Sequence, residues 1–249
     1  MNNHSLFSDK SDLYARARPS YPEEIFNYLA GLCSETHLAW DCACGNGQAA
    51  INLAQQFDSV YASDVSPAQI GNAKKHPRVQ YSVGTSEDVR FDDRSMDLIC
   101  VAQALHWFDY ERFWPQVLRL LKPNGIFCAF GYNLPSINTE IDTLIQKYIL
   151  DVIDPFWAVQ NQLLWNDYKD IDFPFTQIRQ PEFSMTKAWS LAELFAFLHT
   201  FSATRRCMDS KGDSFFNKAY EKVEKSWSNP ESKKIVSFEL VFYVCSNPV

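Results

Sequence analysis

The chain has 249 residues, of which 46% are hydrophobic, so it is long enough for one large domain with a well-filled core. Its net charge of −7 and pI of about 5.2 disfavour duplex nucleic acid as a partner, because proteins bind duplexes largely through Lys and Arg. There is neither a run of 18 apolar residues nor a basic and apolar leader, so we expect a cytoplasmic protein that does not bind membranes.

Strands and helices are expected to alternate through the first half of the chain. A polar and aromatic arm and a helix over about 22–33 precede the first strand. Apolar or alternating runs predict strands over 38–42, 59–63, 79–83, 97–102 and 125–130. The segments between them predict helices over 48–57, 66–75 and 109–121. This alternation indicates a parallel sheet with helices on both faces.

The pattern changes in the second half, where helical segments follow each other without a strand. Helices are expected over 138–150 and 156–168, then a strand over 175–184. A capping box at Ser190 predicts a helix to about 202, and a helix over 213–227 and a strand over 234–245 close the chain. We divide the single domain into four parts: an arm and helix (1–36), a cofactor-binding half (37–133), a helical cap insertion (134–172) and a C-terminal part of the sheet with helices (173–249).

The first two strands carry the strongest functional signal. The first ends at Asp41 and breaks into a turn containing Gly45 and Gly47, and the second is followed by Asp64. A strand, a glycine turn, a helix and a second strand tipped with an acid form a nucleotide-binding unit. The glycines let the backbone approach a ligand closely, and the acid suits ribose hydroxyls.

NAD is one candidate nucleotide, since Gly45-x-Gly47-x-x-Ala50 also fits the dinucleotide fingerprint. Three features disfavour it. Asp41 stands where it could face the amino group of a cationic ligand, no Tyr-x-x-x-Lys pair occurs in the chain, and an arm and helix precede the first strand. An NAD-dependent oxidoreductase is therefore the weaker alternative.

Taken together, these features resemble the class I methyltransferases that use S-adenosylmethionine. The resemblance rests on Asp41–Gly47, Asp64, Gly84–Glu87, a strand opening at Asp97, and Leu120–Gly125. More narrowly, the chain resembles the methyltransferase type 11, trans-aconitate methyltransferase-like group, through Tyr14 with Arg18–Pro22, Ala102–Phe108 and His199–Ala203. This resemblance implies a doubly wound α/β fold, with a mainly parallel seven-stranded sheet whose last strand is antiparallel. Ala43 departs from the family, which has a glycine there, and we expect this alanine to keep a negative φ and to place a methyl group near the ligand.

The resemblance implies S-adenosylmethionine as cofactor, with S-adenosylhomocysteine as product. The implied binding residues are Tyr14, Arg18, Asp41, Ala43, Gly45, Gly47, Asp64, Val65, Thr85, Ser86, Glu87 and Gln103. Asp41 would face the methionyl ammonium, Asp64 would accept both ribose hydroxyls, and Thr85 to Glu87 would follow the adenine edge. Arg18 suits a carboxylate, of methionine or of the substrate, through a two-pronged hydrogen bond. For each residue a purely structural role, as a cap, turn or polar loop, stays open.

His106 and Trp107 are the candidate catalytic residues, because they follow the fourth strand at its ligand-binding end. His106 could orient an acceptor oxygen or take its proton, or it could pack at the rim of a core that contains Trp107. A carboxylate acceptor would need no base, since it is already ionised at neutral pH. Arg205 and Arg206 could either read an acidic substrate or complement a helix end. An aromatic set is either the roof of a pocket or part of the core: Trp157, Trp165, Phe173 and Phe175.

We therefore predict a methyltransferase acting on a small molecule, an organic acid, at a carboxylate oxygen, as a monomer or homodimer. A non-catalytic S-adenosylmethionine-binding protein is the alternative. An amino-methylating nucleic-acid enzyme is disfavoured, because Ala102–Leu105 replaces the Asn/Asp-Pro-Pro-aromatic turn of such enzymes. No metal is expected, since Cys42 and Cys44 lack C-x-x-C spacing, and the odd count of seven cysteines indicates buried thiols in a reducing compartment.

Overall fold

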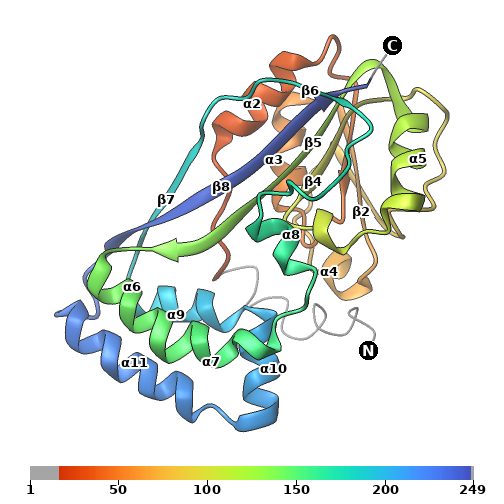
Figure 1. Cartoon of the computed structure of the whole chain (residues 1–249). Helices are drawn as coiled ribbons and strands as arrows, with labels where there is room; N and C mark the ends of the chain where they lie inside the picture. Colours follow the sequence, from red (N-terminus) through yellow and green to blue (C-terminus); the bar gives the residue numbers. More distant parts are fainter. Residues whose placement is uncertain (1–16, 248–249) are drawn as a thin grey trace.

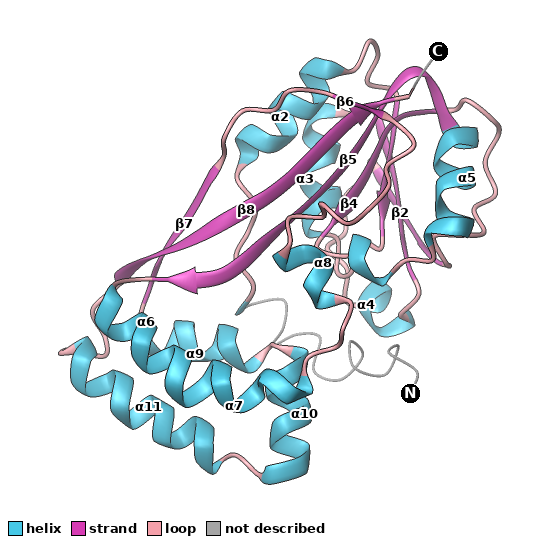
Figure 2. Ribbon diagram, viewed as in Figure 1, coloured by secondary structure: helices cyan, strands magenta, loops and turns pink. Residues whose placement is uncertain are grey.

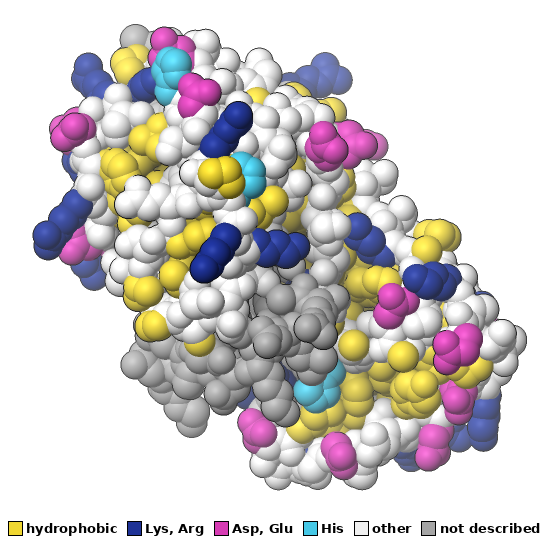
Figure 3. All heavy atoms as spheres, turned by 180° about the vertical axis from the view of Figure 1, so that it is seen from behind, with side chains coloured by type: hydrophobic (Ala, Val, Ile, Leu, Met, Phe, Trp, Pro, Cys, Tyr) yellow, Lys and Arg dark blue, Asp and Glu magenta, His cyan; other side chains and the backbone are white. Residues whose placement is uncertain are grey.

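The computed structural model describes residues 17–247. A twisted sheet crosses the molecule, helices cover both of its faces, and a layer of helices lies at one end (Figures 1 and 2). On the face seen in Figure 3, Lys and Arg side chains are interspersed with Asp and Glu. Within the described residues, no helix is both long enough and apolar enough to cross a bilayer.

The described part of the chain forms one sheet of eight strands in the order β3-β2-β1-β4-β5-β8-β6, with β7 also paired to β8. The strands are β1 (Leu38–Cys42), β2 (Ser59–Asp64), β3 (Val79–Val83), β4 (Met96–Ala102), β5 (Leu121–Ser136), β6 (Thr176–Gln177), β7 (Ser184–Trp189) and β8 (Lys234–Ser246). Strands β1 to β5 are mutually parallel, whereas β8 runs antiparallel to β5. The doubly wound, mainly parallel sheet with an antiparallel last strand is thus confirmed, with one strand more than predicted.

Helices on the two faces bury separate apolar cores. They are α2 (Glu23–Leu32), α3 (Gln48–Gln56), α4 (Pro67–Gly71), the 3-10 helix η2 (Leu105–Trp107), α5 (Tyr110–Leu120) and α8 (Asn161–Trp165). On one face Phe26 of α2 and Leu53 of α3 are fully buried, and on the other Phe113 and Val117 of α5 are. The cores hold the strands in register, so the loops at the strand ends have fixed positions.

Two separate segments of the chain build the helical layer at the end of the sheet. Its members are α6 (Thr139–Ile145), the π-helix η3 (Gln146–Leu150), α7 (Asp151–Ile153), the 3-10 helix η4 (Asp154–Phe156), α9 (Leu191–His199), α10 (Ser202–Lys211) and α11 (Ser214–Trp227). Ile145, Leu194 and Trp227 belong to its common core. The predicted capping box opens α9, where the Ser190 hydroxyl accepts from the Glu193 amide and Glu193 bonds back to Ser190. The helical segment expected over 138–150 is therefore joined in this layer by α9 to α11, whereas α8, also within 134–172, lies on a face of the sheet.

The helix predicted over 156–168 is wrong, because a 3-10 helix ends at Phe156 and only Asn161–Trp165 is α-helical there. Asp167 and Tyr168 adopt left-handed backbone, which an α-helix of L-residues cannot continue. The helix predicted over 66–75 also ends early, at Gly71.

The strand predicted over 175–184 is also wrong. Only Thr176–Gln177 and then Ser184–Trp189 pair with β8, and Pro181 lies in the unpaired stretch, where it has no N–H to give to a ladder. The helix predicted to reach residue 202 ends at His199, and a new helix begins at Ser202. Arg205 and Arg206 therefore lie inside a helix and do not follow one.

Candidate active site

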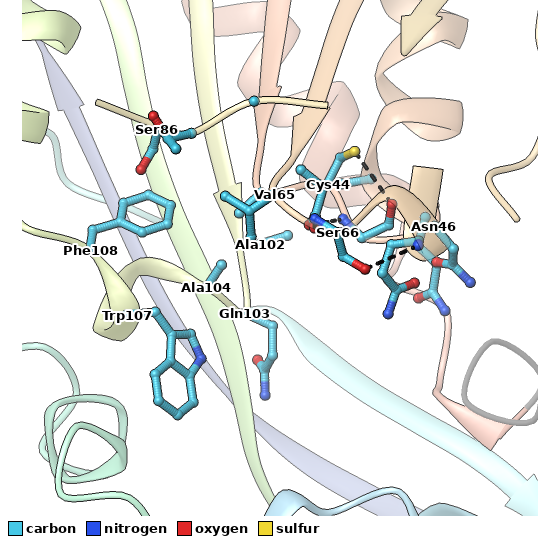
Figure 4. Close-up of a pocket in the computed structure, with 18 of the residues that line it drawn as sticks. Cys44, Asn46, Val65, Ser66, Ser86, Ala102, Gln103, Ala104, Trp107 and Phe108 are labelled. Carbon is cyan, nitrogen blue, oxygen red and sulfur yellow. Dashed lines mark hydrogen bonds between the residues drawn. The ribbon is translucent and has the colours of Figure 1, made fainter. Parts of the chain in front are cut away.

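A pocket of about 530 Å³, here called the outer pocket, opens at the carboxyl ends of β1, β2 and β4 (Figure 4). Open α/β sheets bind ligands at this edge, in the crevice beside their strand ends. The predicted residues that line it are Arg18, Ala43, Gly45, Asp64, Val65, Thr85, Ser86, Glu87, Gln103 and Trp107. Tyr14 lies outside the described residues. Asp41, Gly47 and His106 are described but do not line this pocket.

The glycine turn after β1 is built from three residues with left-handed backbone. Gly45 has φ 55° and Gly47 has φ 83°. A Cβ on Gly47 would lie 2.1 Å from the Tyr81 hydroxyl oxygen, so this position needs glycine for packing as well as for its φ. Gly47 thus shapes the turn from behind, whereas Gly45 faces the pocket.

Ala43 is the third left-handed residue, with φ 57°. The expectation that it would keep a negative φ is wrong, because the turn imposes the conformation that a glycine would take. Left-handed backbone costs an L-residue about 1–2 kcal/mol. Ala43 lines the outer pocket, so the strain lies at the ligand-binding surface.

Asp64 joins the tips of β1 and β2. Its Oδ2 accepts the backbone N–H of Gly45 at 2.9 Å, and its Oδ1 accepts the backbone N–H of Ser66 at 2.8 Å. A carboxylate has about four lone-pair positions, so it can accept several hydrogen bonds at once. Asp64 therefore fixes the glycine turn and also lines the pocket.

Asp41 is fully buried behind the turn, and neither of its carboxyl oxygens makes a hydrogen bond with a described residue. Burial raises the pKa of Asp41 to about 8, and the nearby charge of Asp64 adds to this shift. The backbone N–H of Ala50 opposes the shift without reaching hydrogen-bond geometry. A cation placed near the turn would favour the ionised form of Asp41.

Gln103, directly after β4, separates the outer pocket from a second one. It has φ 58°, and its side chain pairs with the Tyr132 backbone: Oε1 accepts the N–H at 2.8 Å, and Nε2 donates to the carbonyl at 3.1 Å. A Cβ on Gly131 would lie 2.5 Å from Gln103 Oε1, so glycine there makes room for this pairing. In Figure 4, Gln103 and Trp107 lie side by side below the cluster around Ser66.

The second pocket, here called the inner pocket, has a volume of about 80 Å³ and shares Arg18, Gln103, Trp107 and Tyr132 with the outer one. His106 lines it and is only 4% exposed, and burial lowers the pKa of His106 to about 4. Its ring packs on Trp107 with the ring centroids 4.9 Å apart. Trp107 thus lies between the pockets, and His106 faces the inner one.

Arg18 lies at the junction of the two pockets. Its Nη1 donates to the Tyr132 hydroxyl at 3.0 Å, and its guanidinium lies 5.4 Å from the centre of the Phe197 ring. Aromatic faces attract a guanidinium by cation–π interaction, so the Phe197 ring helps to hold Arg18 in place.

The remaining candidates divide between pocket and core. Trp157 and Trp165 line the inner pocket, whereas Phe173 and Phe175 pack on Trp114. Arg206 donates to the Phe156 carbonyl at 3.1 Å, which ties α10 to η4. All seven cysteines are free thiols, and six of them are buried.

Several lining residues were not predicted from the sequence. In the outer pocket they include Cys44, Asn46, Phe108, Arg112 and Tyr132, and in the inner pocket Asn133, Asn161 and Thr200. Cys44 and Asn46 lie within the glycine motif, and Phe108 follows Trp107. The sequence pattern could therefore have identified these three as lining residues. The inner-pocket residues come from segments that only the tertiary fold brings together.

The sheet order and the pocket at its strand ends define a Rossmann-like α/β fold, and comparison with known proteins identifies the class of protein. Residues 40–129 match the family model described as a methyltransferase domain. A Dictyostelium discoideum protein named as a methyltransferase is 32% identical over 200 residues, which cover 79% of this chain and 76% of that protein. The chain therefore belongs to this methyltransferase family.

A solved structure gives the same result at the level of the fold. A type II methyltransferase from Anaeromyxobacter dehalogenans is 29% identical, with a TM-score of 0.86 over 93% of this chain and 98% of that one. A methyltransferase of Mycobacterium tuberculosis is 34% identical over 120 residues, and the chain spans about half (49%) of its length. None of these three names specifies a methyl acceptor.

Proposed function

We propose that this chain transfers the methyl group of S-adenosylmethionine to a small molecule, on an oxygen atom and first of all on a carboxylate. The outer pocket carries the proposal. It combines the glycine turn, the carboxylate of Asp64 and a wall shared with the inner pocket, where an acceptor can lie.

The residues of the outer pocket fit this cofactor. Its volume of about 530 Å³ falls in the usual range of ligand pockets. The carboxylate of Asp64 lines the pocket and suits the ribose hydroxyls. The carboxyl of Asp41 is buried behind the glycine turn and has no hydrogen-bond partner among the described residues, so its charge would favour the methionyl ammonium from there. The N-terminus of α3, at Gln48 and Ala49, lines the pocket and favours the negative methionyl carboxylate. The cofactor supplies an electrophilic methyl group on a sulfonium sulfur.

The acceptor is inferred from charge at the junction of the two pockets. Arg18 can hold a carboxylate through two N–H groups, and the resemblance to the trans-aconitate methyltransferase-like group agrees with an organic acid. A carboxylate is ionised at neutral pH, so no residue has to remove a proton. His106, with a pKa of about 4, is a weak proton acceptor and is suited to positioning. The chain would contribute mainly alignment and exclusion of water.

The test begins with calorimetric titration of S-adenosylhomocysteine, with NAD as the parallel ligand. We expect micromolar binding of S-adenosylhomocysteine and none of NAD, followed by methyl transfer to a member of a panel of mono-, di- and tricarboxylic acids. Binding of NAD alone would overturn the proposal. Binding of S-adenosylhomocysteine without turnover of any acid would favour a non-catalytic binding protein.

A further inference from the structure

Four of the described residues line both pockets and are here called the shared wall: Arg18, Gln103, Trp107 and Tyr132. Under the proposed function, the cofactor occupies the outer pocket and the acceptor occupies the inner one. The methyl carbon and the acceptor atom then meet beside these residues, so the position of the shared wall sets their distance and angle. Methyl transfer depends on that alignment, because small misplacements of reacting groups lower rates strongly.

Gln103 ties the shared wall to the sheet. Strand β4 ends at Ala102, opposite Phe130, whereas β5 continues to Ser136. The backbone of Gln103 still donates its N–H to the Phe130 carbonyl at 2.7 Å. Its side chain bonds to Tyr132, two residues further along β5: Oε1 accepts the Tyr132 N–H at 2.8 Å, and Nε2 donates to the Tyr132 carbonyl at 3.1 Å. The carboxamide thus supplies the acceptor and the donor that the backbone of β4 would supply if the strand continued.

The local backbone is shaped to permit this pairing. Gln103 has φ 58°, in the left-handed region that residues other than glycine rarely adopt. Gly131 lies between the two residues of β5 that bond to Gln103, and a Cβ on Gly131 would lie 2.5 Å from Gln103 Oε1. A rare conformation and a glycine on the neighbouring strand therefore serve one hydrogen-bonded pair. Strain of this kind persists only where the surrounding structure holds it, and it concentrates at functional sites.

The other members of the shared wall are linked to Gln103 over short paths. The turn that carries Trp107 begins directly after Gln103, and the Trp107 N–H donates to the Ala104 carbonyl at 3.0 Å. In Figure 4, Gln103 and Trp107 lie side by side. The Tyr132 hydroxyl accepts from Nη1 of Arg18 at 3.0 Å. A shift of Gln103 would therefore be transmitted through a few covalent bonds and hydrogen bonds to the whole shared wall.

We propose that Gln103 is a positioning residue: its carboxamide, by bonding to the Tyr132 backbone, holds the shared wall where the transferred methyl group and the acceptor atom are aligned. The role needs a side chain of this length that accepts with one atom and donates with the other. Gln103 acts through Tyr132 and Trp107, and the role requires no bond from Gln103 to either substrate. The inference rests on the proposed function, to which it adds the residue that fixes the alignment.

The first experiment follows the shared wall in the full-length protein without any ligand. Nitrogen-15 labelling of tryptophan gives indole N–H signals in NMR spectra, and Trp107→Phe identifies the signal of Trp107. Gln103→Glu keeps the length of the side chain, but its ionised carboxylate has no donor for the Tyr132 carbonyl, whereas its protonated form has one. Partial burial and the facing carbonyl should raise the pKa of this new carboxyl. We expect the Trp107 signal to be displaced at about pH 8.5 and to move back towards its wild-type position as the pH falls to about 5.5.

Two further variants make this experiment decisive. Gln103→Met has a similar volume but lacks the amide donor and acceptor, so its Trp107 signal should be displaced at every pH. Gln55→Glu, on the exposed side of α3, is the matched control for the added charge and should keep the wild-type signal throughout. A Trp107 signal at the wild-type position in both Gln103 variants across the pH range would overturn the proposal. If Gln103→Glu unfolds at high pH, Gln103→Met decides alone.

The second experiment separates positioning from binding. In Gln103→Met we expect the single-turnover rate of methyl transfer to fall roughly tenfold to a hundredfold, with the affinities for S-adenosylhomocysteine and for the acid close to those of the wild type. Weaker binding of S-adenosylhomocysteine with an unmoved Trp107 signal would make Gln103 a ligand contact and would refute the positioning role. An unchanged rate would refute it as well.

The two proposals fail separately. If the wild-type protein does not bind S-adenosylhomocysteine, the proposed function fails, while a pH-dependent Trp107 signal in Gln103→Glu still shows that Gln103 holds the shared wall. If methyl transfer occurs but neither its rate nor the Trp107 signal changes in Gln103→Met, the positioning role fails and the proposed function stands.

Discussion

The outer and inner pockets share a wall but differ in how many of their polar side chains already have hydrogen-bond partners. In the outer pocket both oxygens of Asp64 already accept backbone N–H bonds, and the amide of Gln103 is paired with Tyr132. In the inner pocket, within the described residues, His106 Nδ1 and Asn161 Oδ1 have no partner. Asp64 and Gln103 are therefore held in place by the fold itself, whereas a ligand of the inner pocket would have to supply the hydrogen bonds that His106 and Asn161 lack.

The largest expected effect tests how rigidly the outer pocket is built. Gly47→Ala should lower the free energy of unfolding by about 3 kcal/mol, since left-handed backbone costs about 1–2 kcal/mol and the clash with Tyr81 adds to it. In Gly45→Ala the new Cβ meets no described heavy atom within 4 Å, so only the backbone cost should appear. Denaturant unfolding measures both. An equal loss of unfolding free energy in Gly47→Ala and Gly45→Ala would show that the Tyr81 contact is unimportant.

Asp64→Ala should weaken binding of S-adenosylhomocysteine by about 1–3 kcal/mol, because charge-assisted hydrogen bonds to the ribose are lost and the Gly45 amide loses its acceptor. Titration calorimetry measures this change. Asp92→Ala, at an exposed loop acid, is the control and should bind like wild type. Unchanged affinity in Asp64→Ala would remove Asp64 from the site.

Asp41 should make both stability and binding depend on pH. Its pKa is about 8 in the folded protein against 3.8 ordinarily, so the folded state binds more protons, and stability should fall as pH rises from about 4 to about 8. Asp41→Asn should remove this part of the dependence, as measured by thermal unfolding across that range. At pH 7, binding of a cationic ligand should release up to about one proton, detectable by calorimetry in buffers of different ionisation enthalpy. Identical proton release by Asp41→Asn would contradict this role.

The smallest effect concerns the strained alanine. Ala43→Gly should raise the free energy of unfolding by roughly 0.5–1 kcal/mol, since relief of about 1–2 kcal/mol of strain exceeds the added backbone entropy of the unfolded chain. Denaturant unfolding is the measurement. A loss of stability would mean that packing of the Ala43 methyl outweighs the strain.

The sequence predicted the outer pocket better than the inner one. Strands 38–42 and 79–83 were predicted at their observed bounds, and Gly45, Asp64 and the Thr85 loop line the outer pocket as expected. These residues lie within a few positions of a strand end, where a local pattern records their role. The inner pocket joins His106, Asn161 and Thr200, and Asn161 lies in a segment whose helix was predicted too long.

The sequence by itself determined the alternation of strands and helices and the acid and glycine positions of the nucleotide-binding unit, because local backbone preferences and apolar periodicity encode them. Only the tertiary structure decided that β8 pairs with β5 and also with β6 and β7, that Ala43 takes a left-handed φ, and that His106 and Asn161 line one pocket. These outcomes depend on packing between distant segments. In such cases the free energy gained by burying a whole packed layer outweighs the backbone conformation that a single residue prefers.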